Sequence, residues 1–335
     1  KIDLFPHIWP KAFYDRMQTV SEAAAKYHKN RLKDLPMLVD LEMRFRVMDS
    51  HEGYKQFLTA AGPGIETYCD PNVSPELARI ANDGMAELCA KYPDRFIGFG
   101  ASMPMNNVEA CLEEIDRTVG QMGAKGIQVF TNVLGKPLSH PDFRPIFRKM
   151  HDLDLPIWIH PIRGPQFSDY STETASENEI WFSFGWPYET TACATRLIFS
   201  GIYDELPNLK IVTHHMGGMI PYFAGKIELG FDQIFYGTSK SNPQVVKAGL
   251  KKPILEYYKM LYGDTALNGG VAATKCGHAF FGSDHAVFAT DAPFDAEDGR
   301  LLIRTTIAAI DSLEISKAEK DQIFFGNAKR LLKLN

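Results

Sequence analysis

The sequence predicts an α/β protein whose strands close into a (β/α)8 barrel of the TIM type. Short apolar segments that are typical of strands alternate eight times with segments of helical period. Strands of this kind, buried on both faces and separated by helices, indicate a parallel sheet. Eight such units favour a closed barrel over an open, doubly wound sheet. We expect residues 1–335 to form a single domain.

The predicted elements follow one another in barrel order. Apolar runs predict strands at 2–7, 54–59, 96–102, 126–131, 156–160, 209–213, 259–263 and 286–290. Helical patterns lie at 75–92, 108–121, 143–153, 188–202 and 219–235, and two more, at 301–313 and 317–334, close the chain. The stretch 11–53 is rich in Ala, Lys, Glu and Met, and predicts a helical insertion after the first strand. Residues 164–184 are polar and predict a loop.

Composition excludes several classes of function. The net charge of −5 gives no electrostatic reason to expect binding to nucleic acid or to an anionic membrane. The sequence contains no apolar run near the roughly 18 residues that span a bilayer, and no signal peptide is expected. The five cysteines are odd in number and form no CxxC motif, which predicts reduced thiols in a cytoplasmic protein. Glycine motifs for dinucleotides or phosphates do not follow any predicted strand.

Asp291 ends the last predicted strand, and Pro293 prevents that strand from continuing. A buried carboxylate costs several kcal/mol unless a cation, hydrogen bonds or a metal ion offsets its desolvation. One interpretation is an aspartate that caps a helix or a turn after the strand. The other is a metal ligand or a general acid/base at the mouth of the barrel.

Histidines stand at the ends of other predicted strands. His7 ends the first, His160 the fifth, and His214 and His215 follow the sixth, while Asp264 follows the seventh. The carboxyl ends of barrel strands converge on one mouth, so these side chains are expected to be neighbours. Imidazole and carboxylate together suit Zn, Mn or Fe. Any one of these histidines alone is equally explained as a packed, hydrogen-bonded core residue, but the whole set predicts a metal site.

In these motifs and through nearly its whole length, the chain resembles the amidohydrolase superfamily. Within it, the resemblance is to the branch of γ-resorcylate, 5-carboxyvanillate and aminocarboxymuconate-semialdehyde decarboxylases. Eight stretches carry the resemblance in order. They are an opening similar to Ile-Asp-x-His-x-His at 2–10, the third- and fourth-strand segments 91–100 and 123–132, His-Pro within 155–161, His-x-Gly-Gly within 207–221, Tyr-Gly-Asp-Thr-Ala-Leu at 262–267, Ala-Thr-Asp-Ala-Pro-Phe within 288–294 and the closing helix from 326.

The resemblance implies roles for particular residues. His7, His160 and Asp291 correspond to metal ligands. His215, the histidine of His-x-Gly-Gly, corresponds to the acid/base beside the metal-bound water, and Asp291 is its catalytic partner. His214 matches no functional position of the family, which implies a structural or supporting role.

The first strand departs from the family pattern. Family members carry His-x-His or Glu-x-His there, and this chain reads Phe5-Pro6-His7. Phenylalanine cannot coordinate a metal, so the first ligand is missing. Three protein ligands and a water still form an open catalytic site. We expect a lower metal affinity, and a metal-independent reaction becomes an alternative.

The resemblance implies an enzyme of the carbon–carbon lyase class. The expected activity is metal-dependent, non-oxidative decarboxylation of a hydroxylated aromatic or related unsaturated carboxylic acid, by protonation at the carbon that bears the carboxylate. One divalent metal ion is expected, zinc first and manganese second. The alternatives are a hydrolase or hydratase on the same fold, acting on a lactone or a ring-cleavage product, and a binding protein that has lost its metal. The resemblance alone implies a homo-oligomer, and the expected form is a dimer.

Three residues are candidates for contact with the small-molecule carboxylic acid. Arg163 either pairs with the substrate carboxylate, which suits the guanidinium geometry, or is a surface arginine of its loop. Phe5 and Trp186 either form walls for an aromatic ring or pack in the core.

Overall fold

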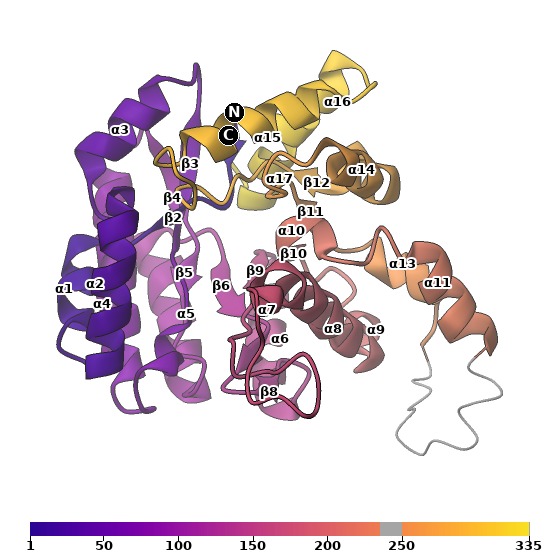
Figure 1. The fold of residues 1–335 in the computed structure, drawn as a ribbon, viewed down its shortest axis with the longest axis horizontal. Helices are drawn as coiled ribbons and strands as arrows, with labels where there is room; N and C mark the ends of the chain where they lie inside the picture. The colour runs from indigo at the N-terminus through magenta and orange to yellow at the C-terminus, as the bar shows by residue number, and fades with distance from the viewer. Residues whose placement is uncertain (235–249, 335) are drawn as a thin grey trace.

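The computed structural model describes residues 1–234 and 250–334, and its parallel strands close into a barrel (Figure 1). Strand β3 (Lys55–Ala60) pairs in parallel with β1 (Ile2–Asp3), β2 (His7–Ile8) and β4 (Phe96–Phe99). A six-stranded parallel sheet continues in the order β5 (Ala101–Ser102), β6 (Ile127–Phe130), β9 (Ile157–His160), β10 (Ile211–Thr213), β11 (Tyr262–Asp264) and β12 (Ala286–Val287).

Backbone hydrogen bonds between the first and last strand regions complete the barrel. The amide of Leu4 donates to the carbonyl of Phe288 (3.0 Å), and the amide of His7 donates to the carbonyl of Ala292 (2.7 Å). The predicted (β/α)8 architecture is therefore confirmed. The first predicted strand is divided into β1 and β2 at Phe5-Pro6, where proline supplies no amide hydrogen for the sheet.

The helical insertion after the first strand consists of separate short helices. They are α1 (Lys11–Met17), α2 (Glu22–Asp34), η1 (Pro36–Leu38) and α3 (Leu41–Asp49). Ser21 caps α2 and Asp40 caps α3, because each side chain accepts a hydrogen bond from a backbone amide three residues later. These helices lie together with α4 (Ser74–Lys91) along one side of the barrel (Figure 1). His28 of α2 is buried against the Trp9 ring, at 4.6 Å between centroids.

The remaining described helices and short strands surround the barrel. They are η2 (Ile65–Thr67), α5 (Val108–Met122), β7 (Asn132–Val133), β8 (Lys136–Pro137), η3 (Pro141–Phe143), α6 (Arg144–Asp152), α7 (Ile180–Ser183), α8 (Gly185–Phe199), α9 (Ile202–Glu205), α10 (His214–Gly217), α11 (Ala224–Glu228), η4 (Leu229–Ile234), α13 (Ile254–Tyr258), α14 (Val271–His285), α15 (Arg300–Asp311), α16 (Lys317–Asp321), η5 (Gln322–Gly326) and α17 (Asn327–Leu332).

Some helical regions differ from the predictions. The helix expected at 219–235 begins later, at Ala224, because residues 218–223 form turns, and its last position, 235, lies outside the described residues. Helix α14 was not predicted. Its sequence contains Gly277 and Gly282, which have poor helix propensity, and Gly282 interrupts the helix with a φ of 69°.

The interior of the barrel is a packed core. Leu4, Phe57, Trp158, Val212 and Val287 are buried there in one hydrophobic cluster, and the rings of Phe57 and Trp158 stack 4.7 Å apart. Side chains fill the barrel, so a ligand can reach the strands only at the mouth formed by their carboxyl ends. Among the described residues, helices are too short or too polar to cross a membrane.

Candidate metal centre

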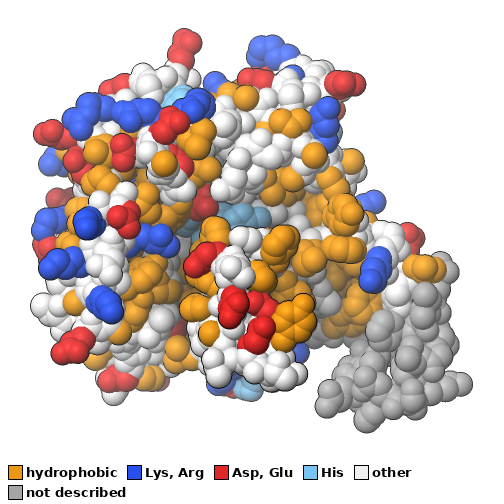
Figure 2. All heavy atoms as spheres, in the orientation of Figure 1, with side chains coloured by type: hydrophobic (Ala, Val, Ile, Leu, Met, Phe, Trp, Pro, Cys, Tyr) orange, Lys and Arg blue, Asp and Glu red, His pale blue; other side chains and the backbone are white. Residues whose placement is uncertain are grey.

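Four side chains from strand ends converge at the mouth of the barrel. His7 lies on β2, His160 ends β9, His214 follows β10, and Asp291 follows β12. All four are buried, and one potential ligand atom of each lies within 4.8 Å of those of the others. Oδ1 of Asp291 is 3.1 Å from Nε2 of His7 and 3.7 Å from Nε2 of His214. Figure 2 shows histidine side chains in a hollow near the centre of the face drawn.

Three of the converging atoms have no hydrogen-bond partner. Nε2 of His7, Nε2 of His214 and Oδ1 of Asp291 are buried and make no hydrogen bond. Buried polar atoms without partners are rare in native proteins. Two imidazole nitrogens and a carboxylate oxygen that face one another in this way fit a divalent metal ion, whose ligands of these types lie at about 2.0–2.2 Å.

The protonation states suit metal coordination. Burial, helped by the nearby His214, holds the pKa of His160 well below its usual range, so this imidazole is neutral. Its Nδ1 is 2.6 Å from the carbonyl oxygen of Pro161, which makes Nδ1 the donor and leaves Nε2 as the coordinating atom. Burial acts to raise the pKa of Asp291, but the imidazoles of His214 and His7 outweigh it and keep the carboxyl group ionised.

Asp264 at the end of β11 orients His214. Its Oδ2 lies 2.6 Å from Nδ1 of His214, and its Oδ1 accepts from the amides of His215 (3.0 Å) and Ala266 (3.1 Å). Burial alone would lower the pKa of His214, but the Asp264 carboxylate raises it to about 9. The carboxylate fixes the proton on Nδ1 and directs Nε2 towards Asp291, an arrangement common behind metal-ligating histidines. A metal ion bound at Nε2 would displace the second proton.

His215 lies beside this group but outside it. Its backbone has a φ of 54° in the left-handed region, which directs its side chain differently from that of His214. The two imidazole centroids are 3.8 Å apart, and the Trp186 ring stacks on His215 at 6.4 Å. Burial and the charge of His214 hold the pKa of His215 well below its usual range, and its buried Nδ1 has no partner. A neutral imidazole therefore borders the candidate metal position.

Phe5 fills the space between the histidines. Its ring is 1% exposed, and its centroid is 4.6 Å from His214, 4.9 Å from His7 and 5.8 Å from His160. The ring therefore lies against the imidazoles of the candidate metal site.

The two other predicted substrate contacts occupy different places. The Trp186 ring meets the His160 ring edge-on at 5.3 Å, and its Nε1 donates to the carbonyl oxygen of Arg163 (3.1 Å). The Arg163 guanidinium is bound by Glu189 (3.0 Å) and stacks on Phe167 at 4.9 Å. Trp186 thus borders the candidate metal centre directly. Arg163 contacts Trp186 through its backbone carbonyl oxygen, and its guanidinium pairs with Glu189.

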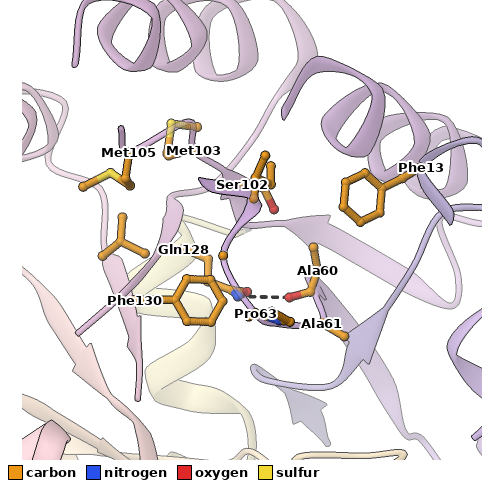
Figure 3. A pocket seen from close by; sticks show the side chains of 12 residues that line it. Phe13, Ala60, Ala61, Pro63, Ser102, Met103, Met105, Gln128 and Phe130 are labelled. Atoms are coloured by element: carbon orange, nitrogen blue, oxygen red, sulfur yellow. Dashed lines mark hydrogen bonds between the residues drawn. The ribbon is translucent and has the colours of Figure 1, made fainter. Parts of the chain in front are cut away.

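A small pocket beside the centre was not predicted from the sequence (Figure 3). Its walls come from the ends of β3, β5 and β6 and from α1. Phe130 contributes to it and contacts the His160 ring at 5.3 Å. Gln128 donates from Nε2 to the carbonyl oxygen of Ala60 (3.0 Å), while its Oε1 is buried without a partner. A glutamine inside a buried strand was the only sequence signal for this pocket.

Comparison with known proteins identifies the family. Residues 7–334 match the protein family described as Amidohydrolase. The chain belongs to this amidohydrolase family.

Relatives of known activity are decarboxylases. The γ-resorcylate decarboxylase of Polaromonas sp. is 32% identical over 309 residues, which cover 89% of each chain. A dihydroxybenzoic acid decarboxylase structure from the same organism, with bound manganese and 2-nitroresorcinol, is 27% identical and superimposes with a TM-score of 0.80 over 100% of this chain and 97% of the other. The 5-carboxyvanillate decarboxylase of Novosphingobium aromaticivorans, complexed with manganese and 4-hydroxy-3-methoxy-5-nitrobenzoic acid, is 26% identical, with a TM-score of 0.83 over 100% and 96%.

Proposed function

We propose that this amidohydrolase is a metal-dependent, non-oxidative decarboxylase of a hydroxylated aromatic carboxylic acid. The observation that carries the proposal is the convergence of unpartnered buried nitrogen and oxygen atoms at the barrel mouth. Relatives of the chain decarboxylate γ-resorcylate, and structural relatives were crystallised with manganese and hydroxylated aromatic compounds. These relatives favour decarboxylation over the hydrolase or hydratase alternative.

His7, His160, His214 and Asp291 would hold one divalent metal ion. Three imidazoles and one carboxylate suit zinc, which remains our first expectation, and also manganese. Manganese gains support from the two relatives that contain it. His214 would supply the fourth protein ligand in a chain whose first-strand ligand position holds Phe5.

The reaction exchanges a carbon–carboxylate bond for a carbon–hydrogen bond and releases carbon dioxide. When bound, the metal would supply Lewis-acid polarisation of the substrate oxygens. His215 would relay the proton that reaches the carbon bearing the carboxylate, its neutral imidazole taking up one proton from water as it gives up the other, because its unpartnered imidazole adjoins the ligand group. Asp291 would act both as a metal ligand and as the base of the reaction, since its carboxyl group is ionised.

The substrate-facing surface would include Trp186, whereas the Phe5 ring, which the sequence offered as a second wall, is 1% exposed and packs among the imidazoles of the candidate ligands. Trp186 would lie against the substrate ring and exclude water, since it already packs on His160 and His215. Arg163 would act on the substrate carboxylate only after exchanging its partner Glu189. A homodimer and a cytoplasmic location remain predictions of the sequence.

Metal analysis and product analysis of the purified chain test the proposal together. We expect about one zinc or manganese ion per chain and release of carbon dioxide from 2,6-dihydroxybenzoate or 5-carboxyvanillate, measured with and without prior chelation. Chelation should abolish turnover, and added metal should restore it. A folded protein without metal affinity, or one that adds water to its substrate without releasing carbon dioxide, would contradict the proposal.

Replacing Phe5 by glutamate is expected to increase the dependence of stability on metal. Without metal, a buried carboxylate at this position should lower the free energy of unfolding by several kcal/mol. With metal bound, the carboxylate gains a cation, so the rise in melting temperature on adding Mn²⁺ should exceed that of the wild type. Thermal unfolding with and without Mn²⁺ measures this, and Phe5→Leu is the control that removes the ring without adding a ligand. Equal metal-induced shifts in all three proteins would show that position 5 lies outside ligand reach.

A further inference from the structure

A fully buried guanidinium lies directly behind the candidate ligand His7. Arg44 of α3 has an exposed fraction of 0%. Its Nη2 donates to the carbonyl oxygens of His7 (2.5 Å) and Met37 (3.0 Å), and its Nη1 donates to Oε1 of Gln56 (2.8 Å). The guanidinium of Arg44 therefore connects η1, β2 and β3 through hydrogen bonds. A buried charge is costly, and these three acceptors offset part of its desolvation, while the buried Nε has no partner.

The hydrogen bonds continue from Arg44 to a buried carboxylate. Gln56 donates from Nε2 to the hydroxyl oxygen of Tyr54 (3.2 Å), and the Tyr54 hydroxyl donates to Oδ2 of Asp3. Oδ1 of Asp3 accepts from the amides of Phe5 and Thr290, both at 3.1 Å. All the side chains in this series are buried. We call the series from Arg44 through Gln56 and Tyr54 to Asp3 the buried polar chain.

The second end of the buried polar chain lies beside Asp291. The hydroxyl of Thr290, the residue immediately before Asp291, also donates to Asp3. The hydroxyl oxygen of Thr290 also accepts a hydrogen bond from the amide of Ala292 (3.2 Å). The carbonyl oxygen of Ala292 in turn accepts one from the amide of His7 (2.7 Å). Hydrogen bonds therefore connect the backbone at His7 with the backbone at Asp291 by two routes. One passes through the buried polar chain, and the other passes directly through Ala292.

We propose that Arg44 is a positioning residue of the metal centre, which acts by holding the backbone of His7 in register with Asp291. The inference rests on the proposed function, because it takes His7 and Asp291 as ligands of one metal ion. It assigns a role to the helical insertion, because α3 places the guanidinium of Arg44 against the backbone carbonyl oxygen of His7. Groups that hold metal ligands from behind typically contribute 10–100-fold to metal affinity.

Arg44→Met should therefore weaken Mn²⁺ binding by about 10–100-fold. Methionine retains an unbranched apolar side chain, but it leaves the His7 carbonyl oxygen and Gln56 without their donor. Arg44→Lys, which keeps a cation and a donor, should recover part of the affinity. The measurement is a calorimetric titration of the chelator-stripped, full-length chain with Mn²⁺, together with the thermal unfolding of each metal-free variant.

Two further variants separate positioning from general stability. Val47→Ala is the matched control: Val47 is fully buried on the same helix and packs in the hydrophobic core, so its loss should lower the melting temperature and leave Mn²⁺ affinity unchanged. Thr290→Val tests the other end of the buried polar chain and should also weaken Mn²⁺ binding, even if Arg44→Met does not fold.

The outcomes distinguish this inference from the proposed function. Weaker binding in Arg44→Met, at a stability where Val47→Ala binds normally, supports the positioning role. Wild-type affinity in folded Arg44→Met, or in Arg44→Lys where Arg44→Met does not fold, overturns that role and leaves the metal centre intact. A wild-type chain that binds neither Mn²⁺ nor Zn²⁺ overturns the metal centre and this inference together.

Discussion

Replacing His214 by glutamine is expected to empty the metal centre and to abolish turnover. Nε2 of His214 faces Asp291 without a hydrogen bond, and Asp264 holds the other ring nitrogen. Glutamine has a similar length but lacks the imidazole nitrogen that coordinates metal. Loss of a supporting group behind a ligand costs about 10–100-fold in metal affinity, so loss of the ligand itself should cost about 100-fold or more.

The measurement is the metal content after dialysis, followed by titration of the stripped protein with Mn²⁺ and Zn²⁺. Asp264→Asn supplies a graded comparison, because it removes the charge behind His214 and should weaken binding by a smaller factor, about 10–100-fold. His140→Gln is the matched control, since its imidazole lies away from the centre on an exposed turn. Normal metal content in His214→Gln would return His214 to the supporting role that the family resemblance implies.

The sequence sufficed for the barrel because its strands and most of its helices, α14 excepted, have a local pattern. It also sufficed to place His7, His160 and Asp291 at one mouth, since parallel strands bring their carboxyl ends together. The sequence did not predict that His214, interpreted as a structural or supporting residue, lies in this group while His215 lies beside it. The side chains of these two neighbouring histidines lie in different places because His215 adopts a left-handed backbone conformation and because Asp264, from another strand, binds His214.

Other features depend on tertiary packing that a single sequence does not reveal. His28 belongs to a segment rich in charged residues, yet it is 1% exposed because it packs against Trp9 from the preceding strand region. In the sequence, Phe5 indicates only that a metal ligand is missing. The structure shows that its ring packs among three imidazoles. Arg44 lies in a helix rich in charged residues, and its burial follows from the position of α3 behind His7.

Replacing His215 by asparagine should separate proton transfer from metal binding. His215 is outside the group of four candidate ligands, yet its centroid is 3.8 Å from that of His214 and its Nδ1 has no partner. General acid–base groups typically contribute 10²–10⁴-fold to rate, so turnover should fall by about that factor. Metal content should stay near the wild-type value, because no proposed ligand is removed.

The decisive comparison is between the two neighbouring histidines in one set of assays. Carbon dioxide release, metal content and Mn²⁺ affinity are measured for His214→Gln, His215→Asn and the wild type. We expect loss of both metal and turnover in the first variant, and loss of turnover alone in the second. Full activity in His215→Asn would remove its acid/base role, and loss of metal from His215→Asn would make it a ligand. We expect these separate roles because Asp264 fixes His214 towards Asp291, while the left-handed backbone places His215 beside Trp186, where an aromatic substrate would meet it.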